Sequence, residues 1–113
     1  MAIKLEIQKR PEVKPLIYVF RNAAFPNQLK IGYTTRSAEI RKNEWPRDPN
    51  WHKYQCIFEE PAVKDDGSDF MDHQIHNDLK RRGFKRIEKE WFKCTFEEFK
   101  ASYIAVKTGT FNE

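Results

Sequence analysis

The sequence predicts an α+β domain in which a small, mostly antiparallel three-stranded sheet is flanked by helices. Three short runs rich in β-branched and aromatic residues predict the strands, at residues 16–21, 29–34 and 53–59. Capping residues followed by apolar side chains at helical spacing predict helices between and after them. At 113 residues the chain has room for one domain with one core, so we expect a single sheet packed against these helices.

The predicted strands differ in how clearly the sequence marks them. The first two runs are separated by residues 22–28, which contain several turn formers, so they are expected to pair as a hairpin. The third run alternates Tyr54, Cys56 and Phe58 with polar residues, and these three side chains are expected to share a buried face. Residues 84–94 are either a short strand or an extended segment.

Three helices are expected from their capping signals. Ser37 is placed to cap the first, which should end before Pro46 because the residue preceding a proline avoids the helical conformation. Ser68 is expected to cap the second, which should stop near Gly83. The sequence T-F-E-E, beginning at Thr95, is a capping box and predicts the start of the third.

The predicted domain occupies residues 16–109, between an N-terminal extension at residues 1–15 and a tail at residues 110–113. The N-terminus is charged where a secretion signal would be apolar, and no apolar run approaches the length that spans a bilayer. Two cysteines stand far apart with no C-x-x-C pattern. These features favour a reducing, intracellular compartment.

The positive charge is concentrated in one segment. The net charge of +4 permits contact with phosphate without demonstrating it. Between residues 80 and 93, seven side chains are Lys or Arg and two are Glu, so this run is either a solvated helix end and loop or a nucleic-acid contact. The candidate nucleic-acid-binding residues are Lys80, Arg81, Arg82, Lys85 and Arg86, together with Arg36 and Arg41.

The first two strands and the next helix carry residues suited to binding an anion. A glycine inside a strand, Gly32, marks either a bulge or a close approach, and the neighbouring Lys30 suits an anionic ligand. Tyr18, on the partner strand, is either a core aromatic or an acid–base group whose phenolate a cation such as Lys30 would favour. Arg41 is either a surface arginine or a bidentate phosphate ligand.

Two acidic residues are candidate metal ligands. Asp72 and His76 are four residues apart on one helix face, and they form either a surface pair or part of a divalent-metal site. Glu90 precedes two large aromatic residues and is either a rim residue or a second acid of the site. A structural zinc is a weaker alternative, because the spacing matches no familiar finger. Its ligands would be Cys56, Cys94, His73 and His76.

These motifs, in this order, resemble the GIY-YIG nuclease superfamily. The first signature resembles L-I-Y at residues 16–18, and the second resembles K-I-G at residues 30–32, extended by Y-T-T-R. The details resemble a branch found in phage proteins and fused to restriction-type helicases. That branch reads K-[IV]-G-Y-T, an arginine, an acid-x-x-[IL]-H and E-W-F. In this chain the motifs fall at residues 30–34, 41, 72–76 and 90–92.

The resemblance implies metal-assisted hydrolysis of phosphodiester bonds in DNA. It implies that Tyr18 is the general base, that Lys30 helps to deprotonate it, and that Arg41 binds the scissile phosphate. Gly32 would let the backbone pack closely under the site, and Asp72 would hold one Mg²⁺ or Mn²⁺. The other implied site residues are Tyr33, which would flank the site, and His76 and less securely His73, which would assist. If Glu90 is the second acid of the site, it is an alternative metal ligand beside Asp72.

The resemblance also implies a biological setting. It suggests a cytoplasmic protein of a bacterial or phage-infected cell that acts on double-stranded DNA in phage biology or restriction. The last residues resemble the stretch that joins such domains to a helicase, which leaves open a larger chain, and a homodimer is open as well. Two other functions remain: a catalytically inactive nucleic-acid-binding module with the same fold, and a protein-interaction domain.

Overall fold

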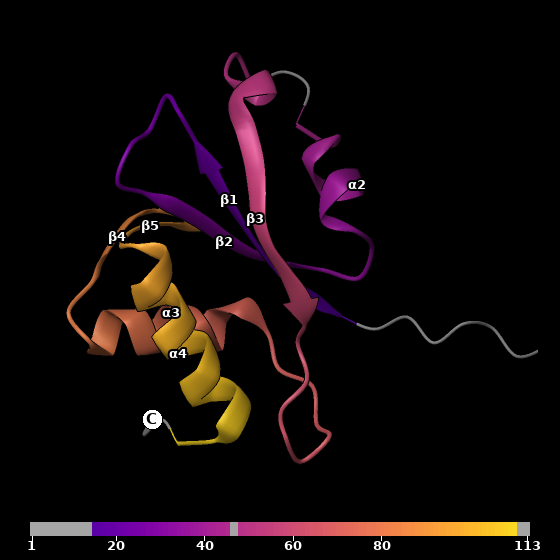
Figure 1. The fold of residues 1–113 in the computed structure, drawn as a ribbon, viewed down its shortest axis with the longest axis vertical. Helices are drawn as coiled ribbons and strands as arrows, with labels where there is room; N and C mark the ends of the chain where they lie inside the picture. Colours follow the sequence, from indigo (N-terminus) through magenta and orange to yellow (C-terminus); the bar gives the residue numbers. More distant parts are fainter. Residues whose placement is uncertain (1–14, 46–47, 111–113) are drawn as a thin grey trace, which may run out of the picture.

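The computed structural model describes residues 15–45 and 48–110, which form an antiparallel sheet with helices on both faces (Figure 1). The five strands are β1 (Leu16–Asn22), β2 (Leu29–Thr34), β3 (Tyr54–Pro61), β4 (Lys85–Glu88) and β5 (Trp91–Lys93), in the order β3-β1-β2-β5-β4 across the sheet. The helices are α2 (Ala38–Lys42), α3 (Asp72–Arg81) and α4 (Phe96–Thr108), with a 3₁₀ turn, η1 (Trp51–Lys53), before β3. In this described part of the chain, no helix has the length and apolar character needed to cross a membrane.

The α+β class is confirmed, but the predicted three-stranded sheet is wrong because residues 84–94 add a second hairpin. Strand β5 pairs antiparallel with β2, with Leu29 opposite Phe92 and Lys30 opposite Trp91, and β4 completes the edge. These strands have only four and three residues. Such short segments cannot display the alternation that reveals a strand in sequence. Of the predicted extension and tail, all but residues 15 and 110 lie outside the described residues.

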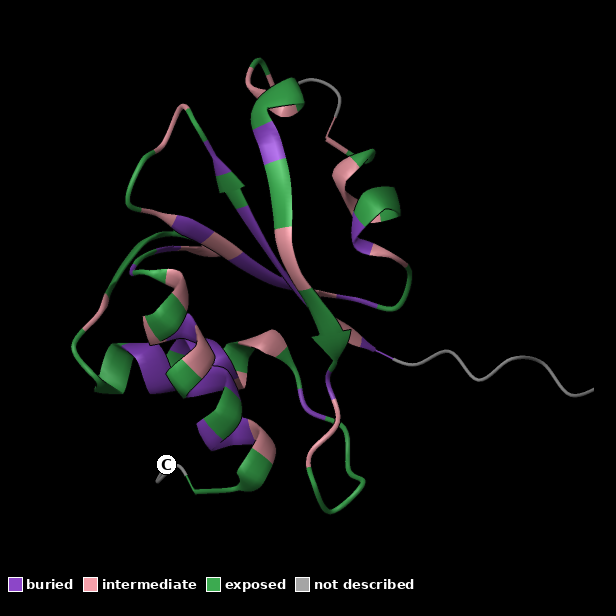
Figure 2. Ribbon diagram, in the orientation of Figure 1, coloured by how far each residue is buried: buried purple, intermediate pink, exposed green. Residues whose placement is uncertain are grey.

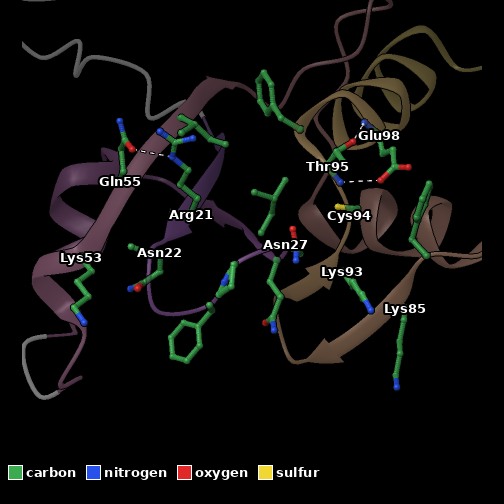
Figure 3. Close-up of a pocket in the computed structure, with 18 of the residues that line it drawn as sticks. Arg21, Asn22, Asn27, Lys53, Gln55, Lys85, Lys93, Cys94, Thr95 and Glu98 are labelled. Carbon is green, nitrogen blue, oxygen red and sulfur yellow. Dashed lines mark hydrogen bonds between the residues drawn. The ribbon is translucent and has the colours of Figure 1, made fainter.

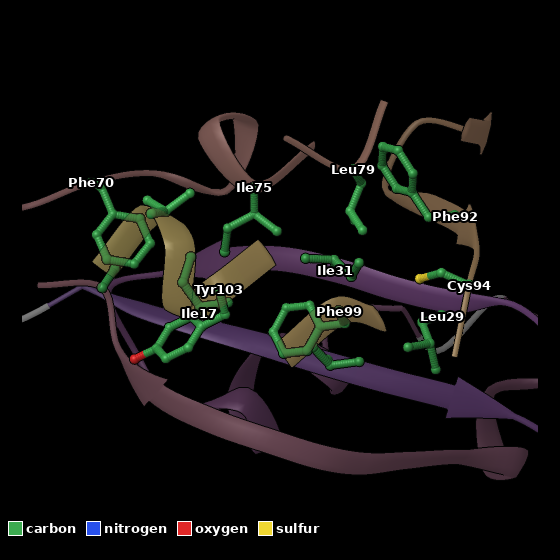
Figure 4. Close-up of a cluster of buried hydrophobic side chains, with 13 residues drawn as sticks. Ile17, Leu29, Ile31, Phe70, Ile75, Leu79, Phe92, Cys94, Phe99 and Tyr103 are labelled. Carbon is green, nitrogen blue, oxygen red and sulfur yellow. The ribbon is translucent and has the colours of Figure 1, made fainter. Parts of the chain in front are cut away.

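The larger of two cores lies between the sheet and helices α3 and α4. Its strand residues include Ile17, Val19 and Ile31, and Ile75 and Phe99 reach it from the two helices (Figure 4). Helices α3 and α4 each turn a buried stripe toward the sheet and an exposed stripe outward (Figure 2). This pattern is the amphipathic one expected of helices that cover one face of a sheet.

The smaller core lies on the opposite sheet face, under α2. It contains Tyr18, Phe20, Tyr54 and Ala38, and Trp45 and Trp91 pack against it. The side chains on both faces of β1 are therefore buried, which explains why its sequence is a continuous apolar run.

Two of the three predicted caps are confirmed. The Ser37 hydroxyl accepts a hydrogen bond from the backbone of Ile40, and Thr95 forms its capping box with Glu98. The prediction that Ser68 caps α3 is wrong, because its hydroxyl bonds the Asp66 carboxylate and the helix starts only at Asp72. An isolated antiparallel bridge between residues 63 and 69 closes the intervening chain into a turn, in which the N–H of Gly67 donates to the carbonyl of Lys64. Helix α2 already ends at residue 42, and residue 46, the expected terminator, lies outside the described residues.

The expected buried face of β3 is also wrong. Tyr54 is buried in the smaller core, Cys56 is exposed, and Phe58 packs against the larger core. A register shift explains the difference: Val19 faces Phe58 while Phe20 faces Cys56, so β3 has one extra residue at this point. Such a bulge turns the side chains that follow it to the other face.

Candidate functional site

Most of the candidate residues of β1 and β2 lie on the face that α2 covers. Tyr18 lies directly opposite Gly32, and Lys30 lies opposite both Phe20 and Trp91. Residues that face each other across antiparallel strands project from the same side of the sheet. Tyr18 and Lys30 are therefore neighbours on one surface, as the strand pattern predicts.

Gly32 makes room for the tyrosine and for an acid from the next strand connection. The Tyr18 hydroxyl donates a hydrogen bond to Oε1 of Glu90 at 2.9 Å. A Cβ at position 32 would lie 2.2 Å from the Tyr18 hydroxyl and 2.6 Å from Oε1 of Glu90. Of the two readings of this glycine, close approach is therefore the correct one, and the approaching groups are side chains of the site.

Two cations border the Tyr18–Glu90 pair. The Lys30 Nζ lies 3.9 Å from Oε1 of Glu90 and 4.6 Å from the centre of the Trp45 ring. The Arg41 guanidinium lies 5.3 Å from the same ring and donates to Glu44 at 2.7 Å. Positive charge over indole faces is stabilising, so Trp45 helps to hold both cations beside the pair.

Arg36 extends the ionic group. It pairs with the second carboxylate oxygen of Glu44, so this acid bridges Arg36 and Arg41. Arginine side chains that bind a carboxylate in this way can also bind a phosphate group. Glu44 was not among the predicted site residues, although its position three residues after Arg41, just past the end of α2, was the signal that could have shown it.

The protonation of Tyr18 is governed by burial and by Glu90. Burial raises the pKa of Tyr18 well above its ordinary value, the Glu90 carboxylate raises it further, and Arg41 acts in the opposite direction. Burial lowers the pKa of Lys30, while the charge of Glu90 opposes that change. In this state Tyr18 is therefore a neutral phenol that donates to Glu90, and Lys30 contacts the acid.

His76 joins α3 to the edge of β2. Its Nε2 lies 2.8 Å from the carbonyl oxygen of Ile31, whose own N–H donates to the backbone of Glu90 at 2.9 Å. Oδ2 of Asp72 lies 3.9 Å from the same Nε2. With its Nε2–H donated to the carbonyl, the imidazole positions the strand beneath Tyr18 and connects Asp72 to this region.

We expect His76 to make the fold sensitive to mild acid. Burial lowers the pKa of His76 below its ordinary 6.5, although the Ile31 carbonyl and nearby acids oppose this. Below pH 6.5 the unfolded chain takes up a proton that the folded state resists, so stability is present above this pH and falls as pH decreases. The slope is at most about 1.4 kcal/mol per pH unit for one group.

Urea unfolding of the wild type and of His76→Gln between pH 7.5 and pH 5.5 measures this effect. The wild type should lose stability across the range, and the glutamine variant should lose less. Equal losses in the two proteins would show that other groups cause the dependence.

The structure does not assemble the alternative zinc site. Among residues 15–45 and 48–110, no three His, Cys, Asp or Glu side chains gather as metal ligands. Cys56 is exposed, whereas Cys94 is buried in the larger core, so the predicted zinc site is wrong. The acids that remain, Asp72 and Glu90, fit Mg²⁺ better, because Mg²⁺ is often held by one or two carboxylates and completed by substrate phosphates and water.

Several other candidates lie away from Tyr18. Tyr33 packs against the larger core on the opposite sheet face. Arg81 and Arg82 both pair with the buried Asp78, and Arg86 donates to the backbone of Lys89. The remaining candidates of this group, Lys80, Lys85 and His73, are exposed.

Comparison with known proteins bears on the whole domain. The sequence model of the T5orf172 domain matches residues 15–107. This is a phage-associated domain related to nuclease folds of the GIY-YIG and HNH-like kinds. No curated protein and no solved structure matches the chain.

Proposed function

Because the chain belongs to the T5orf172 domain family, we propose that it is a divalent-metal-dependent endonuclease of the GIY-YIG type. Its substrate would be double-stranded DNA, in phage biology or restriction. The observation that carries the proposal is the packing of Tyr18 and Glu90 against Gly32, with Arg41 close enough to influence the tyrosine. A phenol, an acid and an arginine on rigid elements supply the groups that phosphodiester hydrolysis needs.

In the proposed reaction, Arg41 leaves Glu44 and binds the non-bridging oxygens of the scissile phosphate. Water then attacks phosphorus as its proton passes to the phenolic oxygen of Tyr18, and the phenolic proton passes to Glu90. The ester bond between phosphorus and the leaving oxygen, on the side opposite to the attacking water, breaks, and that oxygen takes up a proton from solvent. This relay uses the hydrogen bond of 2.9 Å that already joins Tyr18 to Glu90. The relay does not require Tyr18 to be deprotonated before water attacks, which agrees with its raised pKa.

Asp72 would hold the Mg²⁺ or Mn²⁺, because in this relay Glu90 accepts the proton of Tyr18. When bound, the metal supplies positive charge for the leaving oxygen and the phosphate. Asp72 lies in the first turn of α3, and its side chain is about one-sixth exposed, at 17%. The Asp72 carboxylate can therefore be reached by a metal ion from solvent, and the buried His76 lies beside it.

The proposal is tested with supercoiled plasmid in Mg²⁺, in Mn²⁺ and in EDTA. The wild type should nick the plasmid only with metal, and Arg41→Ala and Asp72→Asn should each lose nicking while keeping the wild-type circular dichroism spectrum. Glu39→Gln is the matched control, because Glu39 is an exposed acid of the same helix as Arg41. Wild-type rates in Arg41→Ala would contradict the proposal.

A second function, a catalytically inactive nucleic-acid-binding module, is favoured by one observation. Tyr18 is 0% exposed, so its hydroxyl contacts no solvent in this state. Plasmid binding that weakens steeply with salt, without nicking under any metal condition, would support the binding module. Absence of both binding and nicking would support a protein-interaction domain.

We expect Glu44→Gln to strengthen binding to DNA. The substitution removes the negative charge that Arg36 and Arg41 share, so both guanidinium groups become available to phosphate without competition. We expect affinity for a short duplex to rise several-fold at about 50 mM salt, as befits one or two additional phosphate contacts. Fluorescence anisotropy measures the change, and Glu39→Gln controls for net charge; an equal gain in both variants would exclude a specific role for Glu44.

A further inference from the structure

A groove in the described part of the chain lies on the larger-core face of the sheet, opposite to Tyr18. It has a volume of about 970 Å³ and runs between the end of the β1–β2 hairpin, β3, and the β4–β5 hairpin (Figure 3). Its floor is apolar and continues the larger core, with Leu29, Ile57 and Phe96 among its residues. Nothing in the proposed nuclease chemistry uses this groove.

Four cations surround the apolar floor. Arg21 on β1 and Lys53 at the end of η1 stand on one wall, and Lys85 and Lys93 stand on the β4–β5 wall (Figure 3). All four are exposed, and in the described residues none of them is in an ion pair. Arg21 donates through Nε to Gln55 at 2.8 Å, which fixes the orientation of its guanidinium.

The groove has almost no opposing negative charge. Glu98 is the one acid among its lining residues, and its carboxylate accepts a hydrogen bond from the Thr95 backbone at 2.8 Å as part of the α4 cap (Figure 3). The positive charge of the rim is therefore directed at whatever occupies the groove. A ligand that matches it must carry negative charges on both sides of an apolar or aromatic part.

We propose that this groove binds single-stranded nucleic acid. Phosphates of the strand contact the cations of the two walls, and its bases lie on the floor, where the half-buried rings of Phe25, Phe84 and Phe96 are among the lining residues. A positively charged groove combined with aromatic side chains is the arrangement by which proteins bind single strands with little dependence on base sequence. The site is separate from the nuclease site and is independent of cleavage.

The test uses fluorescein-labelled dT10 in EDTA, with anisotropy measured across a range of salt concentrations. Lys53→Ala and Lys93→Ala, on opposite walls, should each weaken binding several-fold, and the double variant should reduce the salt slope by about 1.4, the value for two phosphate contacts to a single strand. Lys107→Ala is the control, because Lys107 pairs with Asp65 near the end of α4 and lies outside the groove. It should bind dT10 like the wild type.

Four outcomes would overturn the proposal. Wild-type binding of dT10 by the double variant would place the strand elsewhere, and a loss confined to Arg41→Ala would place it at the nuclease site. If the double variant lost more affinity for a ten-base-pair duplex than for dT10, relative to the wild type, a single-strand site would be excluded. Equal displacement of dT10 by a glutamate decamer would show a site for acidic chains in general. Because EDTA prevents metal-dependent cleavage, failure of the proposed nuclease function leaves this result unaffected.

Discussion

Replacing Tyr18 with phenylalanine is expected to reduce plasmid nicking by about 10²- to 10⁴-fold, the usual contribution of an acid–base group. The substitution removes only the hydroxyl that donates to Glu90, while the ring keeps its contacts with Phe20 and Trp45. The fold should therefore survive with a loss of about 1.5–3 kcal/mol, the usual contribution of a hydrogen bond to a charged group. Nicking rates with Mg²⁺, together with urea unfolding, measure the two effects separately.

Tyr54→Phe is the matched control for this variant. Tyr54 belongs to the same aromatic cluster, and its hydroxyl also donates to a carboxylate, that of Asp48, at 2.9 Å. It should lose a similar amount of stability and keep its nicking activity. Wild-type nicking by Tyr18→Phe, or equal losses of activity in both variants, would remove Tyr18 from the proposed chemistry.

The second large effect is expected from Gly32→Ala. The added Cβ would lie 2.2 Å from Cζ and the hydroxyl of Tyr18, far inside contact distance, so the tyrosine or the strand must move. Tyr18 is fully buried and cannot swing into solvent. Overpacking of this kind typically costs 1–3 kcal/mol, so we expect a loss of about 2 kcal/mol in the free energy of unfolding, together with loss of nicking.

A double-mutant cycle identifies the cause of that loss. In a Tyr18→Leu background the shorter side chain leaves space above Gly32, so the added methyl group should cost much less than it does in the wild type. An equal cost in both backgrounds would mean that the strand itself, rather than contact with Tyr18, requires glycine. Urea unfolding of the four proteins gives the coupling free energy.

Sequence predicted the parts of the fold that depend on neighbours along the chain. The alternation of residues 29–34 placed Lys30 and Gly32 on one face, and the structure confirms this. The caps at Ser37 and Thr95 could be predicted because a capping hydrogen bond joins residues only three positions apart. The prediction for Ser68 failed because this residue lies in the turn that the bridge between residues 63 and 69 closes, where its hydroxyl bonds Asp66 instead of a helix N–H.

The sequence predicted the site residues on the two adjacent strands, but it did not predict which side chains from distant segments contact them. Tyr18, Gly32 and Lys30 follow from the pairing of two adjacent strands. The role of Glu90 depends on β5 joining the edge of β2, which brings together residues far apart in sequence and places a carboxylate on Tyr18. Because pKa values depend on burial and on these distant charges, the expectation of a cation-favoured phenolate was replaced by a neutral phenol bonded to an acid.

By itself, the sequence determined the α+β class, the central hairpin, two helix starts and the motifs that mark the family, because periodicity, capping and motif order are local properties. The tertiary structure alone decided the five-stranded sheet, the face on which each side chain of β3 lies, and the direct contact between Tyr18 and Glu90. It also opened the cation-lined groove, whose two walls come from opposite ends of the sheet order. Pairing between distant short strands depends on how the whole core packs, and no single segment encodes it.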